Sequence, residues 1–219
     1  QIFWGFDKIR LLNAIINIEG NKNQINLTEG GGFTGKELSI KNSYINFNID
    51  AIDGGIVWLS PSSDMECKCV LENSIFENKT HDEIIALYGS GKIDAVINNC
   101  KFIIKECTSN PHVIVNISAN NGVYSAVFEK CEFVSEAQNN MTQIIKIENE
   151  TSSSSSKTKF INCNFDILTS GGSFLGGEQK VEYDGIDTCK DNLMCDFINC
   201  IIKIRNGIIY LYMLQMQNL

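Results

Sequence analysis

The sequence predicts an all-β protein, a right-handed parallel β-helix solenoid of about seven coils with three short strands in each coil. Three observations predict this fold. A six-residue pattern returns seven times along the 219 residues, short runs rich in β-branched residues lie between its copies, and no stretch has the period of a helix. A repeat of roughly thirty residues that fills a chain is typical of a solenoid. We therefore expect residues 1–219 to form a single domain, as a segment of a longer chain.

The repeated pattern is an apolar residue, any residue, Asn, a small residue, any residue and a second apolar residue. Its copies span residues 11–16, 40–45, 71–76, 97–102, 128–133, 160–165 and 197–202. The third position is Asn in six copies and Lys130 in the fifth. The six are Asn13, Asn42, Asn73, Asn99, Asn162 and Asn199.

The Asn in this pattern predicts a bend between two strands. In a straight strand, the first apolar residue and the small residue three positions later would point to opposite faces. A bend lets both point inward, and Asn is the non-glycine residue best suited to the left-handed conformation that the bend requires. Because an Asn amide can bond to the Asn one coil above, we expect an internal corner with a ladder of Asn side chains.

The small residue of the pattern predicts an inward column of Ala, Ser and Cys. In the last four copies it is a cysteine. These are Cys100, Cys131, Cys163 and Cys200. A buried thiol behaves as a small hydrophobe, so we expect the four to stack inside the coil as part of the core.

The runs between the copies predict the third strand of each coil. They span residues 55–59, 84–88, 113–117, 144–147, 173–175 and 208–211. They are rich in Ile and Val, which favour strands, and Gly- or Asn-rich turns such as residues 89–91 adjoin them. The alternative is an antiparallel sandwich or barrel of evenly spaced strands, but that fold gives no reason for Asn and Cys at one fixed place in each unit.

Two stretches of the pattern are identical, and they carry a family resemblance. Residues 160–165 read Phe-Ile-Asn-Cys-Asn-Phe, and residues 197–200 repeat Phe-Ile-Asn-Cys; Gly-Gly pairs open residues 54–57 and 171–174. Units of this form, F-x-N-C-x-F alternating with G-G-x-I, resemble the β-helix repeats of polymorphic outer membrane proteins and, more broadly, of the pectate-lyase-like superfamily. The resemblance implies surface display, adhesion or a passenger domain, with enzymes among only some members of the superfamily.

The charge and the hydrophobic pattern exclude some classes of partner and of protein. The formal net charge is −8, so the chain lacks the basic face that nucleic-acid binding requires. There is no run of eighteen apolar residues, so we expect no transmembrane segment in this chain. No leader with a basic start and an apolar centre precedes the repeats, and residues 207–216 are expected to form a last strand, which suggests a piece of a longer protein.

Five N-x-S/T sequons predict a glycoprotein of the secretory pathway, located outside the cell or on its surface. They begin at Asn26, Asn78, Asn116, Asn140 and Asn149. Asn116 lies between Val115 and Ile117, which should point inward, so we expect the Asn116 side chain to point outward. The run of Ser at residues 152–156 beside the last sequon is expected to be a surface turn.

The cysteines outside the small-residue column are disulfide candidates, because a cysteine content near 4% is typical of secreted proteins. We expect a local bridge between Cys189 and Cys195 in the longest unit, and a weaker pairing of Cys67 or Cys69 with Cys107. The total of nine is odd, so at least one thiol stays free or pairs with another chain.

No residues in the sequence predict a catalytic site, a metal site or a cofactor. The carboxylate pairs are Asp50 with Asp53, Asp82 with Glu83, and Asp184 with Asp187, and each is interpreted as a solvated acidic turn. Cys67-Lys68-Cys69 lacks the second ligand pair of a zinc site.

Three functions stay open at this point. The first is a non-enzymatic structural or adhesive module of an extracellular glycoprotein, in a filament or surface coat, whose partners are other copies or other extracellular proteins that it meets end to end or laterally. The second is a module that recognises a glycan or a protein through an exposed aromatic patch, for which Trp4 and Trp58 are candidates. The third is a pectate-lyase-like carbohydrate-active enzyme with clustered carboxylates in a groove.

Overall fold

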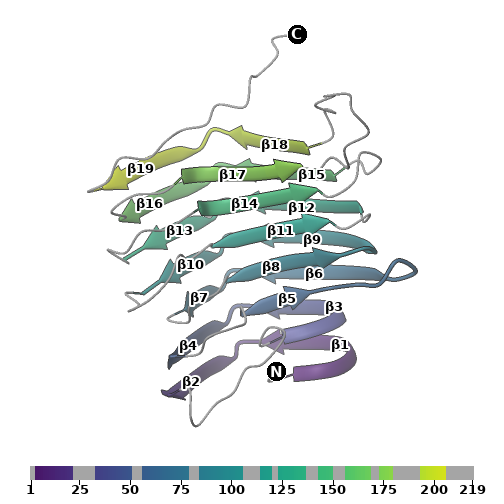
Figure 1. Cartoon of the computed structure of the whole chain (residues 1–219). Helices are drawn as coiled ribbons and strands as arrows, with labels where there is room; N and C mark the ends of the chain where they lie inside the picture. Colours follow the sequence, from purple (N-terminus) through teal and green to yellow (C-terminus); the bar gives the residue numbers. More distant parts are fainter. Residues whose placement is uncertain are drawn as a thin grey trace, which may run out of the picture.

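The computed structural model describes residues 3–21, 33–50, 56–78, 84–105, 114–119, 123–136, 143–149, 156–168, 173–179 and 193–205. All regular secondary structure in these ranges is β-strand, so the predicted all-β class is confirmed. Figure 1 shows the strands stacked in chain order, from β1 and β2 at one end to β18 and β19 at the other.

The strands form three ladders. Ladder A contains β1 (Phe3–Leu12), β3 (Phe33–Lys41), β6 (Glu66–Glu72), β9 (Lys92–Asn98), β12 (Val123–Glu129), β15 (Ser156–Ile161) and β18 (Leu193–Ile198). Ladder B, whose strands each follow a ladder A strand after a two-residue corner, contains β2 (Ile15–Asn21), β4 (Tyr44–Asp50), β7 (Ile75–Asn78), β10 (Lys101–Ile104), β13 (Glu132–Ser135), β16 (Asn164–Leu168) and β19 (Ile201–Arg205). Ladder C contains β5 (Val57–Leu59), β8 (Ile85–Gly89), β11 (Val115–Ala119), β14 (Gln143–Asn149) and β17 (Ser173–Gln179).

Ladders A and C share one twelve-stranded sheet, and ladder B is a separate seven-stranded sheet. Strand β3 joins the two ladders of the larger sheet, because Phe33 pairs with Val57 of β5 while residues 37–41 pair with residues 68–72 of β6. The long β3 therefore spans what becomes two separate strands in the next unit.

All strand pairs in the described ranges are parallel. The triplet β8, β9 and β10 follows β5, β6 and β7 along the chain, and each member pairs with its counterpart in the earlier triplet. The triplets that follow repeat this relation. The antiparallel alternative is therefore wrong, and the topology is compatible with a β-helix solenoid.

The corners between ladders A and B lie where the Asn pattern predicts a bend. Among the described residues, the non-glycine residues with positive φ are the third residues of the seven copies, with φ between 49° and 54°. They are Asn13, Asn42, Asn73, Asn99, Lys130, Asn162 and Asn199. Backbone hydrogen bonds join each corner to the next unit. For example, the Asn99 N–H donates to the Glu129 carbonyl at 2.9 Å. Side-chain amides add two bonds, from Asn73 Nδ2 to Asn42 Oδ1 at 3.2 Å and from Asn99 Nδ2 to Asn73 Oδ1 at 2.8 Å.

The corner is external, whereas the sequence analysis places it inside. The side chains of all six corner Asn residues are exposed. The physical reason lies in the bend itself. In the third copy, for example, Leu71 and Ser74 both turn inward and are buried, so Glu72 and Asn73 between them occupy the outer side of the bend.

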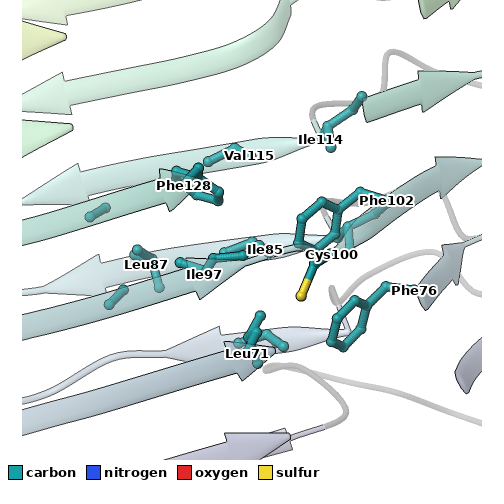
Figure 2. Close-up of a cluster of buried hydrophobic side chains, with 14 of the residues drawn as sticks. Leu71, Phe76, Ile85, Leu87, Ile97, Cys100, Phe102, Ile114, Val115 and Phe128 are labelled. Atoms are coloured by element: carbon teal, nitrogen blue, oxygen red, sulfur yellow. The ribbon is translucent and has the colours of Figure 1, made fainter. Parts of the chain in front are cut away.

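The core is built of in-register columns of side chains. In ladder B, Phe76, Phe102, Phe133 and Phe165 are fully buried and face one another in turn. Their ring centroids are 5.3, 5.2 and 4.6 Å apart with nearly parallel planes. Figure 2 shows Phe76 and Phe102 beside Cys100, with Leu71 and Ile97 of ladder A facing them. Stacked rings bury large apolar area in each of these four strands, which stabilises the parallel register.

A glycine turn connects β8 to β9 and packs against the connection between β5 and β6. The N–H groups of Ser90 and Gly91 donate to the Pro61 carbonyl at 3.2 and 3.1 Å. Gly89 has a φ of +119°, and a Cβ at Gly89 would lie 2.5 Å from the Pro61 oxygen. Only glycine permits this backbone conformation and this close approach.

Candidate functional site

An aromatic cluster lies on the outer side of ladder C and is the candidate binding site. It consists of Trp58 on β5, Tyr88 on β8 and Asn116 on β11. Strand alternation buries Val57 and Leu59 and turns Trp58 outward. Trp58 pairs in register with Ala86, which pairs with Asn116, so the three strands bring the cluster together.

The geometry of the aromatic cluster couples two rings and an amide. The centroids of the Trp58 and Tyr88 rings are 4.9 Å apart with planes at 51°. Asn116 Nδ2 donates to the Tyr88 hydroxyl oxygen at 2.5 Å. The Trp58 and Tyr88 side chains are partly exposed, and Asn116 beneath them is only 5% exposed. Aromatic faces with a polar edge bind sugar rings and protein side chains alike, because they are apolar and hydrogen-bonding at once.

The sequence analysis singled out Trp58 of this cluster but missed Tyr88 and Asn116 as its partners. The register between neighbouring ladder C strands is the signal that could have found them, since Tyr88 lies two residues beyond Ala86 on the same face. Trp4 lies in β1, and the structure does not describe its side chain.

Two of the five predicted sequons carry buried asparagines. Asn78 is 1% exposed because it occupies an inward position in ladder B, in register with Phe47 and Ile104. Asn116 points outward, as strand alternation predicts, but it is only 5% exposed because it is covered within the aromatic cluster. Asn149 is the last residue of β14, while Asn26 and Asn140 lie outside the described residues.

No disulfide forms among the described cysteines, and each expected bridge requires Cys107 or Cys189, so the bridges stay a prediction. Cys67 and Cys69 are buried free thiols, because both point inward from β6 and face the core. Cys195 is a free thiol on the inward column of β18, in register with Thr158, so it faces the core instead of the loop before it. Cys107 and Cys189 lie outside the described residues.

The small-residue column lies in the core, as the pattern predicts. Cys100, Cys131 and Cys163 are at most 2% exposed, and Cys200 in the last unit is partly buried. Their thiols act as weak donors to backbone carbonyls, as from Cys163 Sγ to the Phe128 oxygen at 3.4 Å. Ser74 occupies the same column and donates to the Glu72 carbonyl at 2.8 Å.

Burial keeps the Cys100 thiol of this column and the Cys195 thiol of β18 protonated and chemically quiet. It raises the pKa of the Cys100 thiol to about 11 and that of the Cys195 thiol to about 12. The thiolate is the reactive form, so a thiol with a raised pKa is a poor nucleophile and a poor metal ligand. The column is therefore part of the core.

Most of the described ion pairs join neighbouring strands of a ladder. Lys41 meets Glu72 at 2.7 Å and Lys101 meets Glu132 at 2.9 Å. At the far end of the stack, Arg205 donates to Asp166 at 2.6 Å. These contacts distribute the acidic groups along the stack instead of gathering them at one site.

The carboxylate pairs of the sequence analysis fall on residues that the structure leaves undescribed. Asp50 ends β4 without a described side chain, and Asp53, Asp82, Glu83, Asp184 and Asp187 lie outside the described residues. Within the described part of the chain, no three His, Cys, Asp or Glu side chains come together in a way that could hold a metal ion.

Comparison with known proteins finds no matching protein family, no matching curated protein and no matching solved structure. The resemblance to the polymorphic outer membrane and pectate-lyase-like repeats therefore stays a resemblance of repeat style. In the ranges that the structure describes, no helix is long and apolar enough to span a membrane.

Proposed function

We propose that this chain is a non-enzymatic structural module, a right-handed parallel β-helix of seven coils with an external Asn ladder. The parallel triplets of strands support the coil, because each triplet leads into the next through equivalent corners. With rungs about 4.8 Å apart, seven coils make a rod of roughly 34 Å. Such a rod presents long flat faces and two ends to other macromolecules.

This proposal rests on one observation, which is that the described surface charges pair with one another along the stack. The described ion pairs join neighbouring rungs, apart from Lys130 with Glu129, which are adjacent in sequence. A hydrolase or lyase of polysaccharides instead needs carboxylates that converge on the substrate. Paired charges stabilise the stack and leave its surface suited to contact.

This proposal is tested by measuring polysaccharide turnover and molecular shape on the same preparation of the protein. The purified chain is incubated with neutral and acidic polysaccharides, with and without calcium, and new reducing ends are counted. We expect no turnover, and solution scattering that fits a rod. Turnover that persists through repurification would overturn the proposal and favour the pectate-lyase-like enzyme.

An extracellular location is a separate part of the proposal. It rests on the sequons at Asn26, Asn140 and Asn149, because the other two have buried side chains. Intact mass before and after deglycosylation of protein from its natural source tests it. We expect a mass excess of at most three N-glycans, and no excess would contradict the extracellular assignment.

The aromatic cluster favours a second candidate function, recognition of a glycan or a protein. In that case Trp58→Ala removes the exposed ring and abolishes binding on a glycan array or to a captured partner. Met65→Ala is the control, because it removes an exposed apolar side chain outside the cluster. Equal binding by the wild type and Trp58→Ala would exclude the cluster as the site.

A further inference from the structure

The two end rungs of the stack have open sheet edges within the described part of the chain. Strands β2 and β19 are the outer strands of ladder B, and β18 is an outer strand of ladder A. Strand β1 pairs only with β3 among the described strands. An open parallel edge presents backbone donors and acceptors to a further strand of matching register.

Both end rungs expose apolar side chains at their corners, where most inner rungs have polar or less exposed ones. Ile202 is 40% exposed, although Phe76, Phe102, Phe133 and Phe165 of the same column are fully buried. Beside the corners, the exposed fraction is 66% for Leu12 and 76% for Ile15 at one end, and 41% for Ile198 and 67% for Ile201 at the other. In the inner rungs the same outer columns hold the Lys41–Glu72 and Lys101–Glu132 ion pairs, together with Ile75, which is 39% exposed. Apolar side chains exposed at an end rung suit contact with a further rung of protein, because each unit of a solenoid packs against its neighbour.

We infer that the last rung of one copy stacks head to tail on the first rung of a second copy. The inference rests on the proposed β-helix, whose columns define how a further rung must lie. Continuing each ladder by one rung matches apolar residues with apolar residues. The pairs are Phe197 with Leu11, Ile198 with Leu12, Ile201 with Ile15 and Ile202 with Ile16.

Charge complementarity supports a second copy as the occupant. Asp196 and Arg10 belong to one outward column of ladder A, at its opposite ends. Stacking therefore places the Asp196 carboxylate of one copy one rung from the Arg10 guanidinium of the next. Within the chain, Asp196 lies 3.9 Å from Lys159 on its other side, so the opposite charges alternate across the junction as they do inside the stack.

The backbone at the corner is complementary in the same register. Inside the stack, the Asn162 N–H donates to the Ile198 carbonyl at 2.8 Å, and the Ile201 N–H donates to the Cys163 carbonyl at 2.9 Å. The repeated rule places the Asn199 N–H of one copy against the Leu12 carbonyl of the next. It also places the Ile15 N–H of that next copy against the Cys200 carbonyl. A head-to-tail contact of this kind does not close, so it extends into a filament.

Charge reversal at the two ends tests the inference. Sedimentation velocity over a range of protein concentration is measured for the wild type, for Arg10→Asp, for Asp196→Arg and for an equimolar mixture of the two variants. We expect the wild type to associate, and each variant alone to associate at least tenfold more weakly, because like charges then meet at every junction. The mixture regains wild-type association, because the new carboxylate meets the new guanidinium at one junction and the native pair meets at the other.

Two further variants keep the test decisive. Asp64→Arg makes the same charge change on an exposed turn away from both ends, and we expect wild-type association. Ile15→Lys alters a side chain that is 76% exposed, so it leaves the fold intact and blocks stacking. A wild type that stays a single chain at all concentrations overturns the inference, as do variants that associate like the wild type. A rod-shaped single chain without turnover would contradict the head-to-tail stacking only, and the proposed structural module would still be supported.

Discussion

Removing the Phe133 ring is the strongest test of the stacked core. Phe133 is fully buried, and its ring contacts Phe102 and Phe165 face to face and Phe128 and Phe160 edge on. A buried Phe→Ala change costs about 3–5 kcal/mol through lost transfer energy and the cavity that remains. Aromatic pairs add about 0.5–1.5 kcal/mol each beyond buried area. We therefore expect Phe133→Ala to cost about 5 kcal/mol in free energy of unfolding.

The assay is urea unfolding of Phe133→Ala beside two matched variants. Phe76 ends the aromatic column, because its other in-register neighbour is Ile45, so we expect Phe76→Ala to cost about 3 kcal/mol. Val123 is 42% exposed, and Val123→Ala should cost less than about 0.5 kcal/mol. A cost below about 2 kcal/mol for Phe133→Ala, or one no larger than that for Phe76→Ala, would refute the stacked column.

Three further predictions address the corner, the glycine turn and the thiols. Asn73→Ala should lower stability by about 1 kcal/mol more than Asn73→Gly in urea melts, because Ala is strained at positive φ and Gly is not; equal losses would contradict this. Gly91→Ala should cost about 2 kcal/mol in thermal melts, because its Cβ meets the backbone oxygens of Ser62 and Met65, and an unchanged melting temperature would contradict that clash. Burial raises the pKa of Cys100 from 9.0 to about 11, so the stability it contributes is complete below about pH 9 and is lost as pH rises through about pH 11. Urea melts of reduced protein at about pH 8 and about pH 10 should show this loss, and Cys100→Ser should reduce it, since Ser74 occupies the same column.

The corners and the core could be predicted from the sequence because their physics is local. Asn at a left-handed bend and a small residue directly after it follow from backbone sterics and strand alternation, and the structure has positive φ at each of these positions. The same local reasoning placed the Asn side chains inside, which was wrong. Two consecutive residues must occupy the outer side of the bend, and the pattern alone does not show which two.

The aromatic cluster and the burial of Asn116 could not be predicted from the pattern, because they depend on the register between ladder C strands. Asn116 points outward as alternation requires, yet Tyr88 from the neighbouring strand bonds to its amide. Asn78 is buried because β7 continues inward alternation through its last residue. The inward positions of Cys67, Cys69 and Cys195 could not be predicted for a related reason, since composition does not report whether a thiol faces the core.

The measurement that tests the central claim most directly is a set of nuclear Overhauser contacts between equivalent residues of successive rungs. The account predicts contacts from the Phe102 ring to both the Phe76 and Phe133 rings, and from the Asn99 side-chain amide to Asn73. Contacts that instead pair neighbouring strands in opposite directions, or that link Phe102 to neither ring, would contradict the parallel in-register stack.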